Sequence, residues 1–143
     1  MTEQTVELLD ECSSGCKMAI NSMKQILDFI KDEKLEKIIR SYTEKHQKLE
    51  RETGEQLNEY GRDEEKPGLV ASAMSWISTE AKLMINGNAA QIAKIIMDGC
   101  NMGIQSIGKR INECISASEE SISLAKRLVR TEEDLMLEMK QFL

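Results

Sequence analysis

The sequence contains little proline and few aromatic residues. Its 143 residues include one Pro, and Phe, Trp and Tyr together make up 3%. Aromatic residues are enriched in β-strands, whereas the Lys, Glu, Leu, Ile, Met and Ala that are plentiful here favour helices. The composition therefore predicts an all-α protein. Because 41% of the residues are hydrophobic, which is enough for one core, we expect a single domain over residues 1–143.

Long apolar runs and a strongly basic face are also missing. No apolar run approaches the ~18 residues of a membrane span. The N-terminal segment holds Glu3, Glu7 and Asp10 and lacks the basic and apolar regions of a secretory signal. The formal net charge is -6, with acidic and basic residues interleaved, so no basic face is available for nucleic acid. We expect a cytoplasmic protein that binds neither membranes nor nucleic acids.

The sequence motifs of common enzymes are absent. There is no Ser-His-Asp spacing, phosphate loop or paired acid and base, so hydrolase and nucleotide-binding functions have no support. The 4 cysteines lack the C-x-x-C spacing that is typical of structural zinc sites. In a reducing cytoplasm we expect them to be thiols, because a core of this size needs no disulfide framework.

Apolar residues recur at alternating steps of three and four in four long stretches, a spacing typical of helices packed in a bundle. The predicted helices run over about residues 3–31, from Asp32 as N-cap to a stop at Gly61, from the Asn86–Asn88 turn to Cys114, and from Ser116 or Ser118 to Phe142. A tight turn joins the first two, so they form an antiparallel hairpin, and the last two form another. The connection between the hairpins carries a shorter helix over Leu69–Ile85, just after Pro67.

Two similar octapeptides occupy the middle of the first helix in each hairpin. The segment "GCKMAINS" covers Gly15–Ser22, and "GCNMGIQS" covers Gly99–Ser106. Their matching positions indicate duplication of an ancestral hairpin. The spacing Gly99-x-x-x-Gly103 indicates close approach of another element. This element is either the second helix, the connection or a second subunit. Trp76, in the connection, either lies over the bundle or anchors a dimer, and we expect the first.

Four chemically versatile side chains are predicted to lie at one level of this bundle. Cys16, His46, Cys100 and Glu132 each fall on the apolar face of a different predicted helix. They are about 14 to 17 residues from the turns that close their hairpins, which at about 1.5 Å per residue places them within a few Å of one level. All four are predicted to point into the core.

Two segments are similar to parts of known proteins. The segment "GCKMA" resembles the "GE-x-x-A" segment of rubrerythrin-like proteins, and "SAMSWISTEAKLMINGN" is similar to the connection in a family of uncharacterised bacterial ferritin-like proteins. With its two hairpins, the chain therefore resembles the ferritin-like superfamily, in which each hairpin supplies a Glu from its first helix and a Glu-x-x-His from its second. The resemblance implies a ferritin-like four-helix bundle with an additional crossover helix.

Most metal ligands of that superfamily are replaced here. Cys16 and Cys100 stand where the first helices would supply Glu, and in the Glu-x-x-His positions only His46 has the residue type of the family. One carboxylate, Glu132, is too few for a di-iron site, so ferroxidase and peroxidase activity are not expected. The resemblance then implies a non-catalytic bundle without a cofactor. It would act as a subunit or scaffold, in a homo-oligomer or with a protein partner, in bacterial stress or sporulation.

Two interpretations of the mid-bundle residues stay open. Cys16, His46, Cys100 and Glu132 together are acceptable ligands for one zinc or iron ion, which would make the chain a metal-binding or redox protein. Alternatively, the two cysteines are small core residues, and His46 and Glu132 satisfy each other through a buried hydrogen bond.

Overall fold

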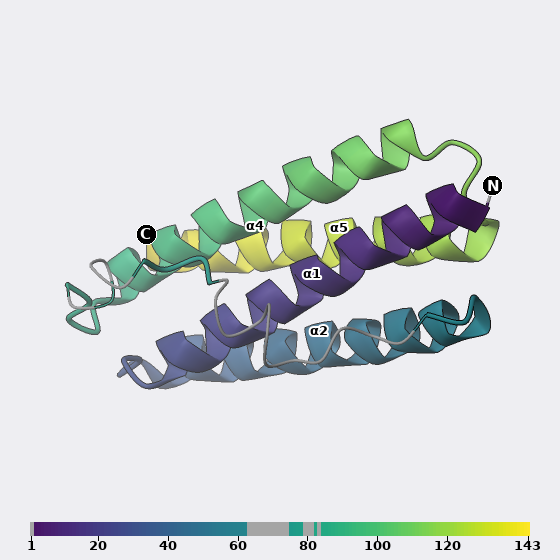
Figure 1. Ribbon diagram of the computed structural model, residues 1–143. Helices are drawn as coiled ribbons and strands as arrows, with labels where there is room; N and C mark the ends of the chain where they lie inside the picture. Colours follow the sequence, from purple (N-terminus) through teal and green to yellow (C-terminus); the bar gives the residue numbers. More distant parts are fainter. Residues whose placement is uncertain (1, 63–74, 79–81, 83) are drawn as a thin grey trace.

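Four long α-helices make up most of the computed structural model, which describes residues 2–62, 75–78, 82 and 84–143. They are α1 (Thr2–Leu27), α2 (Glu33–Glu59), α4 (Ala89–Glu113) and α5 (Glu119–Met139), followed by a short 3-10 helix, η1 (Lys140–Phe142) (Figure 1). No strand occurs in these ranges, so the predicted all-α class and four-helix bundle are confirmed. None of the described helices has the length and apolar character needed to cross a membrane. Most of the helix predicted over Leu69–Ile85 lies outside the described residues, and residues 75–78, which are described, are not helical, so the prediction is wrong there.

The first helix ends at Leu27 instead of continuing to about residue 31 as predicted. Asp32 is outside any helix because its side chain accepts a hydrogen bond from the Leu35 N–H at 3.0 Å and thereby caps α2. The residues between Leu27 and Asp32 reverse the chain, and two of them, Phe29 and Ile30, pack against the core. Their apolar side chains extend the sequence pattern of α1 although their backbone is already part of the turn.

The second helix ends at the glycine that the sequence predicted. Gly61 has φ 72°, a conformation that side-chain-bearing residues rarely adopt. Its N–H bonds to the Asn58 carbonyl at 3.0 Å, and the Arg62 N–H bonds to the Leu57 carbonyl at 3.1 Å. These two bonds satisfy carbonyl groups in the last turn, which is the usual way for a glycine to terminate a helix.

The turn between α4 and α5 is anchored to the start of α1. Ser118, rather than Ser116, caps α5, since its side chain accepts from the Ser121 N–H at 3.1 Å. Backbone N–H groups of this turn donate to α1: Ser116 to Gln4 Oε1 at 2.7 Å, and Ser118 to Thr5 Oγ1 at 2.9 Å. The end of α4 therefore lies beside the beginning of α1, so these two neighbouring helices are antiparallel.

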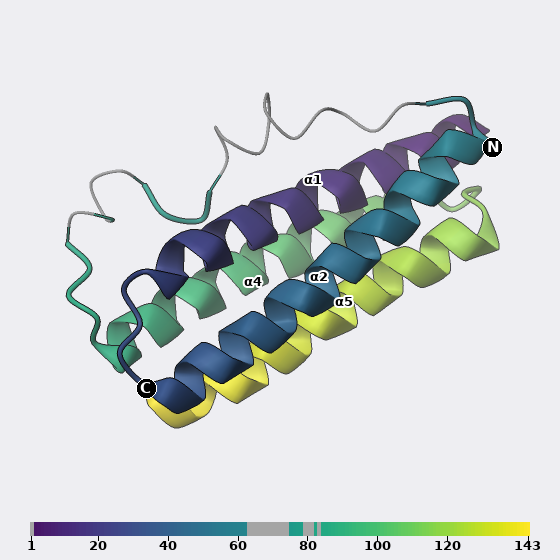
Figure 2. The ribbon, with the colours of Figure 1, turned by 90° about the horizontal axis from the view of Figure 1, so that it is seen from below.

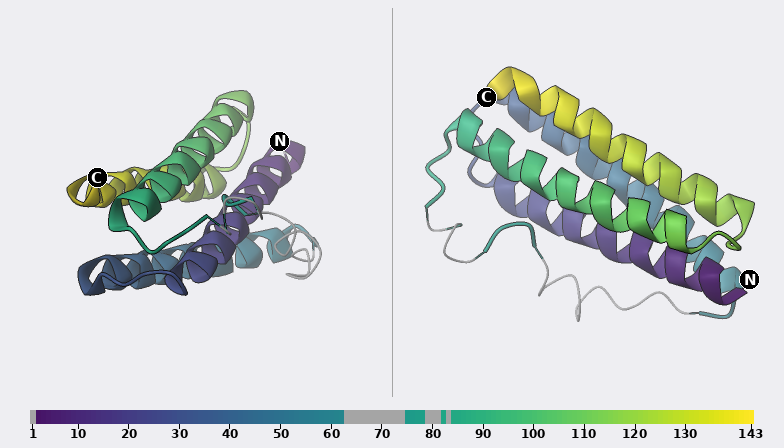
Figure 3. Two further views of the ribbon diagram at one scale, coloured as in Figure 1. Left: turned by 90° about the vertical axis from the view of Figure 1, so that its left-hand side faces the viewer. Right: turned by 90° about the horizontal axis from the view of Figure 1, so that it is seen from above.

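The second helix ends and α4 begins at opposite ends of the bundle. Where α2 ends, Arg62 pairs with Asp10, in the first half of α1, at 2.8 Å. Where α4 is about to begin, Gly87 lies so close to the Phe29 carbonyl that a Cβ on it would be 2.8 Å from the oxygen. As a result α2 and α4 run in the same direction, α1 packs beside α4, and α2 packs beside α5 (Figures 2 and 3).

The interior consists of two apolar clusters with a polar pair between them. The residues predicted to face the core are buried or half-buried in all four helices. In α2, His46 lies between Tyr42, in one cluster, and Leu49, in the other. In α5, Glu132 likewise separates residues of the two clusters. The polar pair therefore occupies the boundary between two apolar regions, at the middle of the bundle.

Trp76 lies over the bundle, as predicted, and packs on α4 at Gly99. A Cβ on Gly99 would be 2.1 Å from Trp76 Cδ2, so the indole uses the space that the glycine leaves. The backbone N–H of Trp76 donates to Ser22 Oγ on α1 at 2.7 Å. This segment of the connection therefore contacts both α1 and α4, and it explains the close approach that the glycine spacing indicated.

We expect Gly99→Ala to lower the free energy of unfolding by about 1–3 kcal/mol, because the added methyl group overlaps the indole of Trp76. The matched variant Gly108→Ala, in the same helix, has no neighbouring atom within 4 Å of its new Cβ. It should raise that free energy by about 0.5–1 kcal/mol, since alanine loses less backbone entropy on folding. Urea unfolding followed by circular dichroism measures both, and equal effects would contradict the packing of Trp76 on Gly99.

Candidate functional site

The four residues selected from the sequence all lie inside the bundle. Cys16, His46 and Cys100 are 0% exposed, and Glu132 is 2% exposed. His46 and Glu132 are in direct contact, and Cys100 lies near Glu132. Cys16 is a member of the other apolar cluster, with Leu49 and Leu128 among its members. The structure thus brings His46, Glu132 and Cys100 together from α2, α5 and α4.

Both ring nitrogens of His46 are engaged. Nδ1 is 2.6 Å from the carbonyl oxygen of Tyr42, one helical turn earlier. A carbonyl oxygen only accepts, so Nδ1 carries a proton and donates it. Nε2 is 2.6 Å from Glu132 Oε1, across the α2–α5 interface. The imidazole is therefore held at both ends, and its orientation is determined by the backbone on one side and by a carboxylate on the other.

The pKa of His46 is raised although the ring is fully buried. Burial opposes the charged ring and by itself lowers the pKa. The hydrogen bond and the negative charge of Glu132, with a contribution from the Tyr42 carbonyl, act in the opposite direction and outweigh burial. The ring therefore stays protonated to a higher pH than a free histidine, and Glu132 is its counter-ion.

Three of the cysteines are held as neutral thiols. Burial raises the pKa of Cys100, and the nearby charge of Glu132 acts in the same direction. Burial, with the nearby Glu11, raises the pKa of Cys12 to about 12. Burial and neighbouring acids also raise the pKa of Cys114. None of the four cysteines forms a disulfide, and all four are buried. Reactive and metal-binding cysteines require the thiolate, so these surroundings oppose both roles.

The arrangement does not favour a metal ion at the mid-bundle residues. Among the residues that the structure describes, no three His, Cys, Asp or Glu side chains are grouped so that they could hold one. His46 could bind a metal through Nε2 only by giving up Glu132, because Nδ1 carries the proton shared with Tyr42. A zinc or iron site made of Cys16, His46, Cys100 and Glu132 stays a prediction from the sequence.

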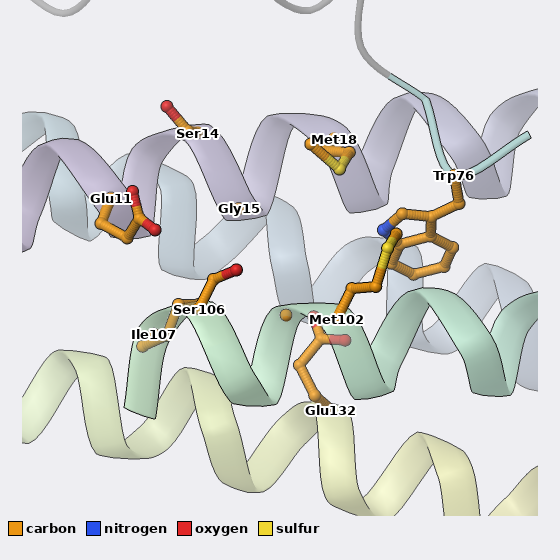
Figure 4. Close-up of a pocket in the computed structure, with 10 residues that line it drawn as sticks. Glu11, Ser14, Gly15, Met18, Trp76, Met102, Ser106, Ile107 and Glu132 are labelled. Atoms are coloured by element: carbon orange, nitrogen blue, oxygen red, sulfur yellow. The ribbon is translucent and has the colours of Figure 1, made fainter. Parts of the chain in front are cut away.

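A cavity of about 220 Å³ lies beside the polar pair, between α1 and α4 (Figure 4). Glu132 reaches it from α5, passing Gly103, where a Cβ would lie 3.5 Å from Oε2. Trp76 lines the cavity at one end, and Glu11 lines it at the other. Glu132 Oε2 is buried and has no hydrogen-bond partner among the described residues. Glu132 Oε1 therefore bonds to His46, and Oε2 is unpaired at the cavity wall.

The sequence patterns predicted the His46–Glu132 contact but not this cavity. A signal was present, because Met18 and Met102 are matching positions of the two octapeptides and both line the cavity. Helical periodicity assigns such residues to a core-facing or solvent-facing stripe. It does not report where two neighbouring helices leave space between them, because that depends on how closely the helices pack.

The chain matches no protein-family model, no curated protein and no solved structure. The functional interpretation therefore depends on the geometry of the chain itself, and the ferritin-like resemblance stays an expectation from the sequence.

His46 is the only histidine in the chain, so its ring can be titrated without ambiguity by NMR. We expect a pKa above the ordinary 6.5 in the wild-type protein and below 6.5 in Glu132→Gln, because burial then acts without the opposing carboxylate. Stabilisation by the charged pair is complete below the unfolded-state pKa of about 6.5 and is lost as pH rises through the higher folded-state value.

The matched control for this titration is Glu133→Gln, which removes the same charge from an exposed neighbour on α5. It should leave the pKa of His46 almost unchanged. A wild-type pKa below 6.5, or equal values in Glu132→Gln and wild type, would contradict the charged pair.

Proposed function

We propose that the protein is a non-catalytic, ferritin-like four-helix bundle that acts as a subunit or scaffold in the bacterial cytoplasm, in stress or sporulation. The observation that carries this proposal is the engagement of both His46 ring nitrogens, by Tyr42 and Glu132 at 2.6 Å each. The histidine expected to bind metal in a ferritin-like bundle is occupied by contacts within the protein. Such a residue supports the fold and is poorly placed for chemistry.

The direction of the helices supports a ferritin-like arrangement. Because α2 and α4 run in the same direction, α2 ends and α4 begins at opposite ends of the bundle, near Arg62 and Gly87. One long crossover between two antiparallel hairpins distinguishes ferritin-like bundles from simple up-and-down bundles. The polar pair joins the two hairpins inside this arrangement, since His46 belongs to the first and Glu132 to the second.

Exposed apolar side chains support an interaction with a second copy or another protein. Met84, Leu137 and Leu143 are 74%, 60% and 66% exposed. They belong to the end of the bundle where α4 starts and where α5 and η1 finish, and α4 contacts η1 there. Large exposed apolar side chains that gather in one region are typical of interaction surfaces. We therefore propose that this end of the bundle takes part in assembly.

Metal analysis of protein purified without a chelator tests the non-catalytic assignment. We expect much less than one equivalent of zinc or iron per chain, because the imidazole and thiols are held in states that do not bind metal. The same measurement on Cys16→Ala and His46→Ala, with circular dichroism to verify folding, provides the comparison. A stoichiometric metal that is lost in both folded variants would favour the metal-binding alternative and overturn the proposal.

Sedimentation analysis over a range of concentrations tests the proposed assembly. We expect a homo-oligomer that Leu137→Gln dissociates, because a buried leucine contributes about 1.5–3 kcal/mol to an interface. The matched control is Ile115→Gln, which removes an apolar side chain that is 79% exposed at the opposite end of the bundle. A protein that stays monomeric at all concentrations, or equal effects of the two variants, would contradict assembly through this end.

A further inference from the structure

The cavity between α1 and α4 has the features of a small built site. Its volume is about 220 Å³, which is enough for a molecule of several non-hydrogen atoms. It is bounded by side chains of α1, α4, α5 and the connection, as Figure 4 shows for Met18, Met102, Glu132 and Trp76. Three helices and the indole therefore border one space that adjoins the buried polar pair.

The inner wall presents a hydrogen-bond acceptor that the protein leaves unused. Glu132 is 2% exposed, its Oε1 is bonded to His46, and its Oε2 has no partner among the described residues. A buried carboxylate oxygen without a donor is costly, so a ligand that donates a hydrogen bond to it gains affinity. Because Gly103 has no side chain, it leaves space between the cavity and the carboxylate of Glu132.

The charged residues around the cavity favour a positively charged ligand. Of the described residues that line it, Glu11 and Glu132 are acidic and none is basic. Within the pair, the charge of Glu132 is balanced by the His46 ring, so Glu11 can balance one further positive charge. An anion would meet two carboxylates, whereas a cation with an N–H group satisfies both the charge of Glu11 and the empty position at Glu132 Oε2.

The remaining wall favours an apolar body next to that charge. Trp76, Met18, Met102 and Ile107 line the cavity. An indole face attracts ammonium groups as well as hydrocarbon, and thioether side chains adapt to the shape of a small apolar ligand. Ser14 and Ser106 add hydroxyl groups near the acidic end. A ligand with one cationic head and a short hydrocarbon chain matches this distribution of groups.

We propose that this cavity binds a small alkylammonium ion, whose ammonium group donates to Glu132 Oε2 and is attracted by the charge of Glu11, and whose hydrocarbon chain packs against Trp76 and the two methionines. This binding function is independent of the proposed role as a subunit or scaffold. It uses an oxygen of Glu132 that the His46 contact does not use, so the fold and the site can coexist.

Titration with n-butylammonium chloride, followed by tryptophan fluorescence and by calorimetry, tests the proposal. Trp76 is the only tryptophan in the chain, so a saturable fluorescence change reports on the cavity directly. We expect saturation with butylammonium, binding of the isosteric neutral 1-butanol at least about tenfold weaker, and no saturation with butyrate or potassium chloride. Butyrate binding would overturn the charge selection, and equal binding of 1-butanol would show that the ammonium charge is not recognised, which would overturn the proposal.

Variants locate the binding site. Glu132→Gln and Glu11→Gln should each weaken butylammonium binding at least about tenfold, whereas the exposed control Glu133→Gln should leave it unchanged. Because Glu132→Gln also disturbs His46, Glu11→Gln serves as the independent variant, since Glu11 is half-buried on α1 and does not contact the polar pair's hydrogen bonds. The proposal is wrong if wild-type protein shows no saturable response, or if Glu11→Gln binds as tightly as Glu133→Gln.

Discussion

The hydrogen bond between His46 and Glu132 is the interaction on which the packing of this bundle depends. It joins α2 of the first hairpin to α5 of the second, at 2.6 Å and away from solvent. Either charge alone would be strongly unfavourable in this interior, so any packing that separates them is penalised. The Tyr42 carbonyl fixes the ring from the other side. The pair thereby sets how the two hairpins are placed along each other.

The same pair creates an asymmetry at the middle of the bundle. One oxygen of Glu132 is used by His46, and the other lies at the wall of the cavity next to Gly103. Trp76 bridges α1 and α4 because its indole packs on Gly99, which has no side chain, and because its backbone N–H donates to the Ser22 hydroxyl. Trp76, from the connection between the hairpins, therefore forms part of the cavity wall. Glu132, which stabilises the fold through His46, also contributes a hydrogen-bond acceptor to the cavity.

The contact between His46 and Glu132 could be predicted from the sequence, whereas the end of α1 and the cavity could not. Periodicity and the distance from the turns located His46 and Glu132 at one level, and the structure confirms their contact. The sequence pattern predicts that α1 ends about four residues beyond its actual end, because Phe29 and Ile30 are apolar although they belong to the turn. The cavity was not predicted, since it results from the spacing of α1 and α4 and from the position of Trp76, which comes from a distant part of the sequence.

The sequence by itself determined the helical class, the buried face of each helix, and the capping residues Asp32 and Gly61. These properties follow from local spacing, in which side chains three and four positions apart share a face and end groups find nearby partners. Only the tertiary structure decided why the pKa of His46 is raised and why Glu132 Oε2 is unpaired. Both depend on distances between atoms of separate helices, and those distances exist only once the helices have packed.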